Sequence, residues 1–135
     1  LVDADTLAFN KIMQAFGLPK ATEEEKKARK QAIQEATKFA IEIPFRVMET
    51  AYESMAVIKQ MVIEGNPNSV TDAGVGALCA RSAVIGACMN VRINATGYDD
   101  KVFVNDIVTR AKAIEAKAIA LEAEIVGLVN AKIGV

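Results

Sequence analysis

Apolar residues recur every three or four positions along almost the whole chain, which is the spacing of amphipathic helices and not of strands. The pattern predicts four helices separated by short polar or glycine-containing segments. They cover residues 1–16, 23–64, 70–94 and 101–130. We therefore expect an all-α fold, a helical bundle of long antiparallel helices joined by short loops.

The ends of these segments carry residues with strong preferences at helix termini. Gly17 and Gly65 are expected to adopt the left-handed conformation that ends many helices. The N-terminal ends carry side chains that can accept from the first free amides. These are Thr22 with Glu25, Ser69 with Asp72, and Asp99 or Asp100.

Pro44 lies in the middle of the long second segment. Proline has no backbone N–H, and its ring clashes with the preceding helical turn. We therefore expect a kink or a break in this helix near Ile43.

The length of 135 residues is that of one domain, which we place at residues 1–135. Long helices in so short a chain present more apolar surface than four elements can cover. A second copy of the chain could cover the remainder, so we expect a homodimer.

Composition removes several kinds of chemistry. The chain contains no histidine, which excludes a Ser-His-Asp triad, a His-ligated zinc and an imidazole proton shuttle within it. Any acid or base must be Asp, Glu, Lys, Tyr or Cys, and we expect no metal. With 16 basic and 17 acidic residues the net charge is −1, which disfavours binding to nucleic acid.

The two cysteines and the longest apolar stretch bear on the cellular compartment. Cys79 and Cys88 are nine positions apart on one expected helix and face opposite ways, so they cannot form a disulfide with each other. Free thiols are typical of a reducing compartment, and we expect a cytoplasmic protein. The stretch Ala73–Ala95 is interrupted by Arg81, Asn90 and Arg92, which argues against a membrane span.

Asp5 is the first candidate for catalysis. It lies at the centre of the apolar face expected for the first helix, next to Leu1 and Phe9. Burial there would favour the protonated carboxylic acid, which could deliver a proton to a leaving group. The alternatives are that the helix end leaves Asp5 in water, or that Asp5 pairs with a basic residue.

Two further features are candidates for ligand contact. The third helix carries a strip of small residues with Asp72 at one end and Asn90 and Asn94 at the other, which would let a flat ring approach and would orient it. Ordinary close helix packing explains the same strip. Lys20, in the first loop, could receive an anionic group or be a plain surface lysine.

Several motifs, in order along essentially the whole chain, resemble one family. They are residues 1–9, 18–20, 22–26, Pro44, 65–74 and 90–94. Together they are similar to the cyclodeaminase domain of formiminotransferase-cyclodeaminase and its stand-alone bacterial relatives. Methenyltetrahydrofolate cyclohydrolases of one-carbon metabolism are close relatives of the same group.

The resemblance implies an all-α homodimer that converts 5-formimidoyltetrahydrofolate to 5,10-methenyltetrahydrofolate and ammonia, as in histidine degradation. It implies that Asp5 is the proton donor and that Lys20, Asp72, Asn90 and Asn94 are candidates for folate contact. The folate is the substrate, so no added cofactor is expected. A formiminotransferase domain or protein is the partner that the family suggests.

The family also has an upstream segment with a Pro-Gly-Gly-Gly-Ser loop, and the printed sequence begins after it. We expect the chain to lack that segment. Two alternatives to the cyclodeaminase therefore stand beside it: a methenyltetrahydrofolate cyclohydrolase that uses the same pocket, and a non-catalytic helical module for dimerisation.

Overall fold

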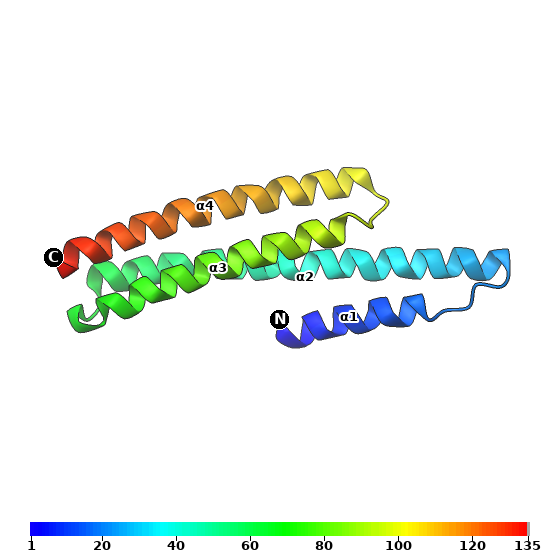
Figure 1. The fold of residues 1–135 in the computed structure, drawn as a ribbon, viewed down its shortest axis with the longest axis horizontal. Helices are drawn as coiled ribbons and strands as arrows, with labels where there is room; N and C mark the ends of the chain where they lie inside the picture. Colours follow the sequence, from blue (N-terminus) through cyan, green and yellow to red (C-terminus); the bar gives the residue numbers. More distant parts are fainter. Residues whose placement is uncertain (135) are drawn as a thin grey trace.

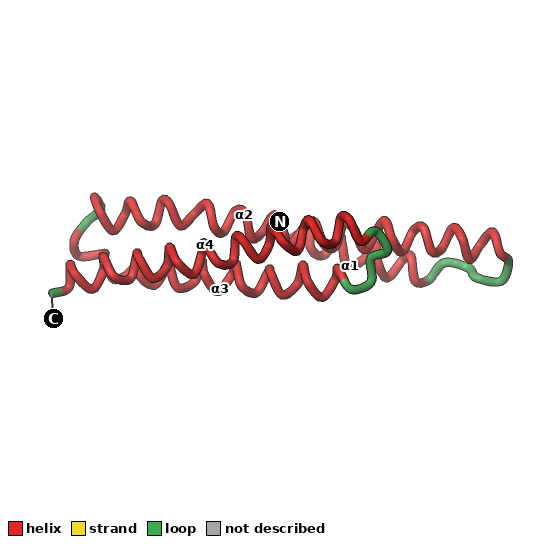
Figure 2. Tube along the Cα trace, turned by 90° about the horizontal axis from the view of Figure 1, so that it is seen from above, coloured by secondary structure: helices red, strands yellow, loops and turns green. Residues whose placement is uncertain are grey.

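The computed structural model describes residues 1–134. In chain order the elements are α1 (Val2–Phe16), α2 (Glu23–Glu64), the short 3₁₀ turn η1 (Pro67–Ser69), α3 (Val70–Ala95) and α4 (Lys101–Ile133). Figure 1 shows α3 running antiparallel to both α2 and α4, with α1 beside the N-terminal half of α2. The second view shows that short loops join them (Figure 2). The all-α prediction is confirmed, and no strand occurs within residues 1–134.

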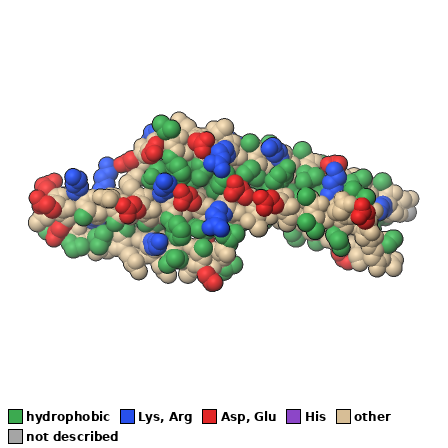
Figure 3. Space-filling model, turned by 180° about the vertical axis from the view of Figure 1, so that it is seen from behind, with side chains coloured by type: hydrophobic (Ala, Val, Ile, Leu, Met, Phe, Trp, Pro, Cys, Tyr) green, Lys and Arg blue, Asp and Glu red, His purple; other side chains and the backbone are tan. Residues whose placement is uncertain are grey.

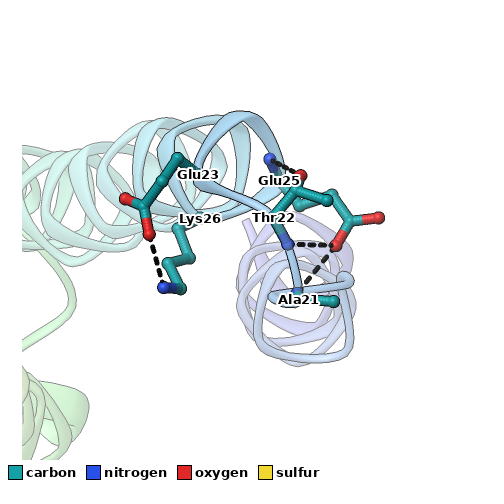
Figure 4. A network of polar contacts seen from close by, with 5 residues as sticks. All are labelled: Ala21, Thr22, Glu23, Glu25 and Lys26. Atoms are coloured by element: carbon teal, nitrogen blue, oxygen red, sulfur yellow. Dashed lines mark hydrogen bonds and ion pairs between the residues drawn. The ribbon is translucent and has the colours of Figure 1, made fainter.

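The predicted cap at the start of α2 is confirmed. The Glu25 amide donates to Thr22 Oγ1 at 3.1 Å, and Glu25 Oε2 accepts from the amides of Thr22 at 3.1 Å and Ala21 at 2.7 Å (Figure 4). At the start of α4, Asp100 Oδ1 accepts from two amides at 3.0 Å each. These bonds satisfy amides that have no partner within the helix, so both helix starts are fixed by their own sequences.

Three details of the helix ends were predicted wrongly. Ser69 makes no side-chain cap bond, because η1 precedes α3 and supplies a turn of its own. Gly17 and Gly65 do end their helices, but with φ of −77° and −74° neither is left-handed. At Gly65 the reason for glycine is space, because an added Cβ would clash with the Met61 carbonyl oxygen.

Of the kink or break expected near Pro44, the break does not occur, since α2 is one helix of 42 residues. Pro44 leaves the carbonyl of Ala40, four residues earlier, without its helical donor. The Asn94 side chain of α3 replaces the missing donor, because its Nδ2 donates to the Ala40 oxygen at 2.8 Å. A partner from a neighbouring helix thus lets the proline stay inside α2.

The core has two parts. The main cluster lies between α2, α3 and α4, and its largest fully buried side chains are Ile41, Met48, Met55, Val62, Val84, Val91 and Ile125. A small cluster of Ala8, Ala40 and Ile43 holds α1 against α2. α1 therefore depends on one small contact surface, while the other three helices share a common core.

Much apolar surface stays open to solvent. On α1 the exposed fractions are 82% for Val2, 62% for Phe9 and 56% for Met13, and on α3 they are 60% for Met89 and 65% for Ile93. On the face opposite to that of Figure 1, side chains of both charge signs are mixed with hydrophobic ones (Figure 3). The expected excess of apolar surface over what four helices can cover is thus present in the structure.

The segment Pro67–Ala95, which forms η1 and α3, is long and apolar enough to cross a membrane by length and composition, with a mean hydropathy of 1.4 in its most apolar stretch. In this fold α3 packs against both α2 and α4. It also carries Arg81 and Arg92. Only 33% of that apolar stretch is buried in the bundle, and the rest contributes to the exposed apolar surface.

Candidate active site

A groove runs between α1 and α3, with α2 as its floor. Its volume is about 710 Å³, within the range of small-molecule sites. α1 contributes its first turn, α2 the two turns that follow Pro44, and α3 its second half. The lining residues are Leu1, Val2, Asp5, Thr6, Pro44, Val47, Thr50, Ala51, Ser54, Ala83, Gly86, Ala87 and Asn90.

A smaller hollow of about 210 Å³ adjoins this groove and shares Asp5, Pro44 and Asn90 with it. The hollow also includes Asn94, and its other walls are Ala8, Phe9, Ile12 and Ala40. Because both hollows have the same three residues in their linings, we treat them as one site, called the α1–α3 groove from here on.

Asp5 is exposed, and the expected burial of its carboxyl is wrong for this structure. Asp5 is three and four positions from Ala8 and Phe9, so it lies between the sides of α1 that these two residues occupy. Ala8 is packed on α2, whereas Phe9 is open to solvent. Since α1 packs on α2 over only a small surface, Asp5 lies at the rim of that contact. The carboxyl borders the groove within reach of solvent and of a ligand.

Asn90 and Asn94 come from one face of α3 and lie near Asp5. Asn90 is exposed and lines both hollows. Asn94 is half-buried, and its Nδ2 is engaged with the Ala40 carbonyl at 2.8 Å. The structure therefore brings together three of the five candidate residues, since the carboxyl residue and both amide residues line the smaller hollow.

Lys20 and Asp72 are not near Asp5. Asp72 lines a separate hollow of about 280 Å³ beside the α2–α3 turn, and 18 residues of helix place it about 27 Å from Asn90. Lys20 lies in the loop after α1, whereas Asp5 is in its first turn, so most of the helix separates them (Figure 1). The small-residue strip on α3 thus lines two separate hollows, one at each end of the helix.

Three hydroxyl side chains in the groove were not singled out from the sequence: Thr6, Thr50 and Ser54. Ser54 Oγ donates to the Ala51 carbonyl at 2.7 Å, and Thr6 Oγ1 has a weaker bond to the Val2 carbonyl at 3.4 Å. Thr50 and Ser54 are one helical turn apart on α2. Hydroxyls at that spacing beside Pro44 are the signal that could have marked them.

The groove contains one ionisable side chain among the described residues that line it, the carboxyl of Asp5. Amides and hydroxyls supply the other polar groups, and most of the wall is apolar. Residues 1–134 hold no group of three or more metal-ligating side chains. Such a site can hold a flat, largely neutral ring and move a proton at one edge of it.

The family described as Formiminotransferase-cyclodeaminase matches residues 1–113. A methenyltetrahydrofolate cyclohydrolase of Methylorubrum extorquens is 36% identical over 133 residues, which are 98% of this chain and 64% of that protein. The formimidoyltransferase-cyclodeaminase of Gallus gallus is 36% identical over 113 residues, 82% of this chain and 21% of that protein. The enzyme of the same name from Mus musculus is 32% identical over 132 residues, 98% of this chain and 24% of that protein.

The chain thus spans about two thirds of the length of the bacterial relative and about a quarter or less of the animal ones. The family match covers well over half of the chain and includes α1, α2, α3 and the first part of α4. All three helices that form the groove lie inside that match. This chain belongs to the formiminotransferase-cyclodeaminase family.

Proposed function

We propose that the protein carrying this chain is an enzyme acting on carbon–nitrogen bonds at N5 and N10 of a tetrahydrofolate derivative. Its reaction would be the cyclodeamination of 5-formimidoyltetrahydrofolate to 5,10-methenyltetrahydrofolate and ammonia. The observation that supports the proposal is the α1–α3 groove of a chain in this family, because Asp5, Asn90 and Asn94 are all among the residues that line it.

The reaction needs one proton moved between two nitrogens. N10 adds to the carbon of the protonated formimidoyl group, which gives a tetrahedral carbon that bears N5, N10 and an amino group. The Asp5 carboxylate takes the proton from N10 and returns it to the amino nitrogen, which then leaves as ammonia. The product is the methenyl cation, so charge and protons balance without another reagent.

Exposure of Asp5 is compatible with this role, because a relay accepts and returns a proton and needs no permanently protonated acid. A ligand in the groove would cover the carboxyl and exclude water from it. The apolar wall and the polar groups would hold N10 close to the formimidoyl carbon, which favours the intramolecular attack. No metal takes part in this proposal.

A second candidate is methenyltetrahydrofolate cyclohydrolase activity, which the name of the Methylorubrum extorquens relative favours. Water would then add to the methenyl carbon and give one proton to Asp5. Its second proton would pass to the ring nitrogen whose bond to that carbon opens, which gives the neutral formyl product. The same groove suits both reactions, because the bicyclic ring and the attacked carbon are shared.

We also propose that the protein forms a homodimer in the cytoplasm. The exposed apolar stripes on α1 and α3 support association with a second copy, and the two free cysteines suit a reducing compartment. A formiminotransferase domain or protein is the proposed source of the formimidoyl group, since relatives bear both activities in their names.

The test follows the near-ultraviolet absorbance of methenyltetrahydrofolate with the full-length protein. Its appearance from 5-formimidoyltetrahydrofolate, with release of ammonia, supports the cyclodeaminase. Its disappearance from added methenyltetrahydrofolate, at a rate above that in buffer, supports the cyclohydrolase instead. Absence of both reactions in a folded protein would contradict the proposed enzyme.

A further inference from the structure

The unusual contact in this fold joins Pro44, Ala40 and Asn94. Pro44 has no N–H to give to the carbonyl of Ala40, so that buried carbonyl needs a donor from elsewhere. Asn94 Nδ2 donates to it at 2.8 Å, across 54 positions of the chain. Both Pro44 and Asn94 line the α1–α3 groove, so this hydrogen bond lies beside the candidate site.

The contact fixes which way the Asn94 amide faces. A carbonyl oxygen can only accept, so the amide must turn its NH₂ group toward Ala40. Asn94 Oδ1 then lies at the other end of the amide group, and it is not the acceptor of any hydrogen bond found within residues 1–134. It is also not among the buried polar atoms without a partner, so it is accessible to solvent, and Asn94 is one of the residues that line the smaller hollow.

We infer that the missing N–H of Pro44 serves to position the Asn94 side chain, because it leaves the Ala40 carbonyl free to accept from Asn94. This hydrogen bond holds the Asn94 amide in one orientation, so that Oδ1 is a fixed acceptor for an N–H donor of the ligand. The inference rests on the proposed function, for which the donor is an N–H edge of the reduced pterin ring. Asn94 is a specificity-determining residue in this account, and Pro44 is a positioning residue that acts through it.

Holding an acceptor in place is useful because a free amide could present either its oxygen or its NH₂ group to a ligand. An acceptor with a fixed direction favours rings that carry N–H at the matching edge and disfavours rings that carry a bare acceptor there. The contact should therefore act on substrate binding and leave the proton transfer at Asp5 largely unaffected.

The test is a double-mutant cycle on the full-length enzyme with Asn94→Ala, Pro44→Ala and both together. In the native background, Asn94→Ala should raise KM about tenfold and keep kcat within about threefold. Pro44→Ala restores an in-helix donor to the Ala40 carbonyl, which frees the Asn94 amide to rotate. In that background Asn94→Ala should raise KM by less than about threefold.

Asn105→Ala is the matched control, since Asn105 is exposed on α4 and outside the groove, and its KM should equal that of the native enzyme. Asn94→Leu, which keeps the approximate size of the side chain but has neither the NH₂ group nor the acceptor oxygen, should raise KM as Asn94→Ala does and replaces it if that variant does not fold. Equal KM ratios in the two backgrounds, or an unchanged KM in Asn94→Ala, would overturn the inference.

The failure of this inference can be told apart from the failure of the proposed function. A native enzyme that turns over neither folate substrate contradicts the function. An active native enzyme whose Asn94 variants keep the native KM contradicts only the positioning role. A merely structural role would lower the thermal unfolding midpoint of Asn94→Ala and leave no KM coupling with Pro44.

Discussion

The two cysteines show how strongly the face of a helix decides the chemistry of a side chain. Cys79 and Cys88 both belong to α3, yet Cys79 is exposed and Cys88 is fully buried. Burial raises the pKa of the Cys88 thiol, and the nearby Glu115 carboxylate, 3.7 Å from Sγ, raises the pKa further. Because the thiolate is the reactive form, both effects protect Cys88.

We expect iodoacetamide at pH 8 to modify Cys79 in the native protein and to modify Cys88 about 100-fold more slowly or not at all. Mass spectrometry of the digested protein measures both sites, and the denatured protein, in which both should react, is the control. Similar rates for the two cysteines under native conditions would mean that Cys88 is not enclosed as the structure shows.

Asp5 shows what periodicity can and cannot predict for a single residue. The spacing predicts that it lies among buried apolar residues, whereas in the structure it lines the open groove that α1 forms with α2 and α3. The spacing does not say whether a neighbouring helix covers that side of α1, and here the contact with α2 reaches Ala8 and leaves Asp5 exposed. The candidate was found from the sequence, but its environment depends on packing between helices.

At the scale of elements, the helix boundaries are local properties and were largely predictable. The Thr22 capping box and the Asp100 cap are made by residues within four positions of each helix start. The continuity of α2 was not predictable in this way. The hydrogen bond that replaces the missing N–H of Pro44 comes from Asn94, 50 residues further along the chain. Local signals thus predict helix ends better than helix interiors.

Gly86 lies on α3 and lines the groove, so a substitution there changes both the stability of the helix and the space left for the substrate. An added Cβ there has no atom within 4 Å, so Gly86→Ala should stabilise the helix by roughly 0.5–1 kcal/mol. Because Gly86 lines the groove, the methyl group should raise KM several-fold, by about three- to tenfold. Denaturant unfolding and steady-state kinetics measure the two effects.

Gly127→Ala on α4 is the matched control for this experiment. Gly127 also has no atom within 4 Å of an added Cβ, and it does not line the groove. It should stabilise the protein to a similar degree with no change in KM. A native KM in Gly86→Ala would indicate that substrate does not lie against this part of α3.

At the scale of the molecule, the exposed apolar stripes are the main feature that the four helices leave unexplained. Val75, Leu78, Met89 and Ile93 are all exposed on α3, and Phe9 and Met13 are exposed on α1. Their excess was foreseen from the sequence, because helical spacing counts apolar positions. Which stripes remain uncovered could be learned only from the packed structure.

If a second copy covers α3, the native protein should sediment with twice the mass of one chain. Ile93→Glu, which places a charge in that interface, should sediment as a single chain. Val102→Glu is the control: Val102 is 82% exposed at the start of α4, and this variant should keep the native mass. A single-chain mass for the native protein at every concentration tested would contradict the dimer.

The central claim is that Asp5 moves the proton in the α1–α3 groove, and its most direct test compares two neighbouring carboxyls of α1. Asp5→Asn should lower kcat for methenyltetrahydrofolate formation by about 10²- to 10⁴-fold with the helical content retained. Asp3→Asn, an exposed position outside both hollows, should keep kcat within about twofold. A native kcat in Asp5→Asn, or an equal loss in both variants, would contradict the account.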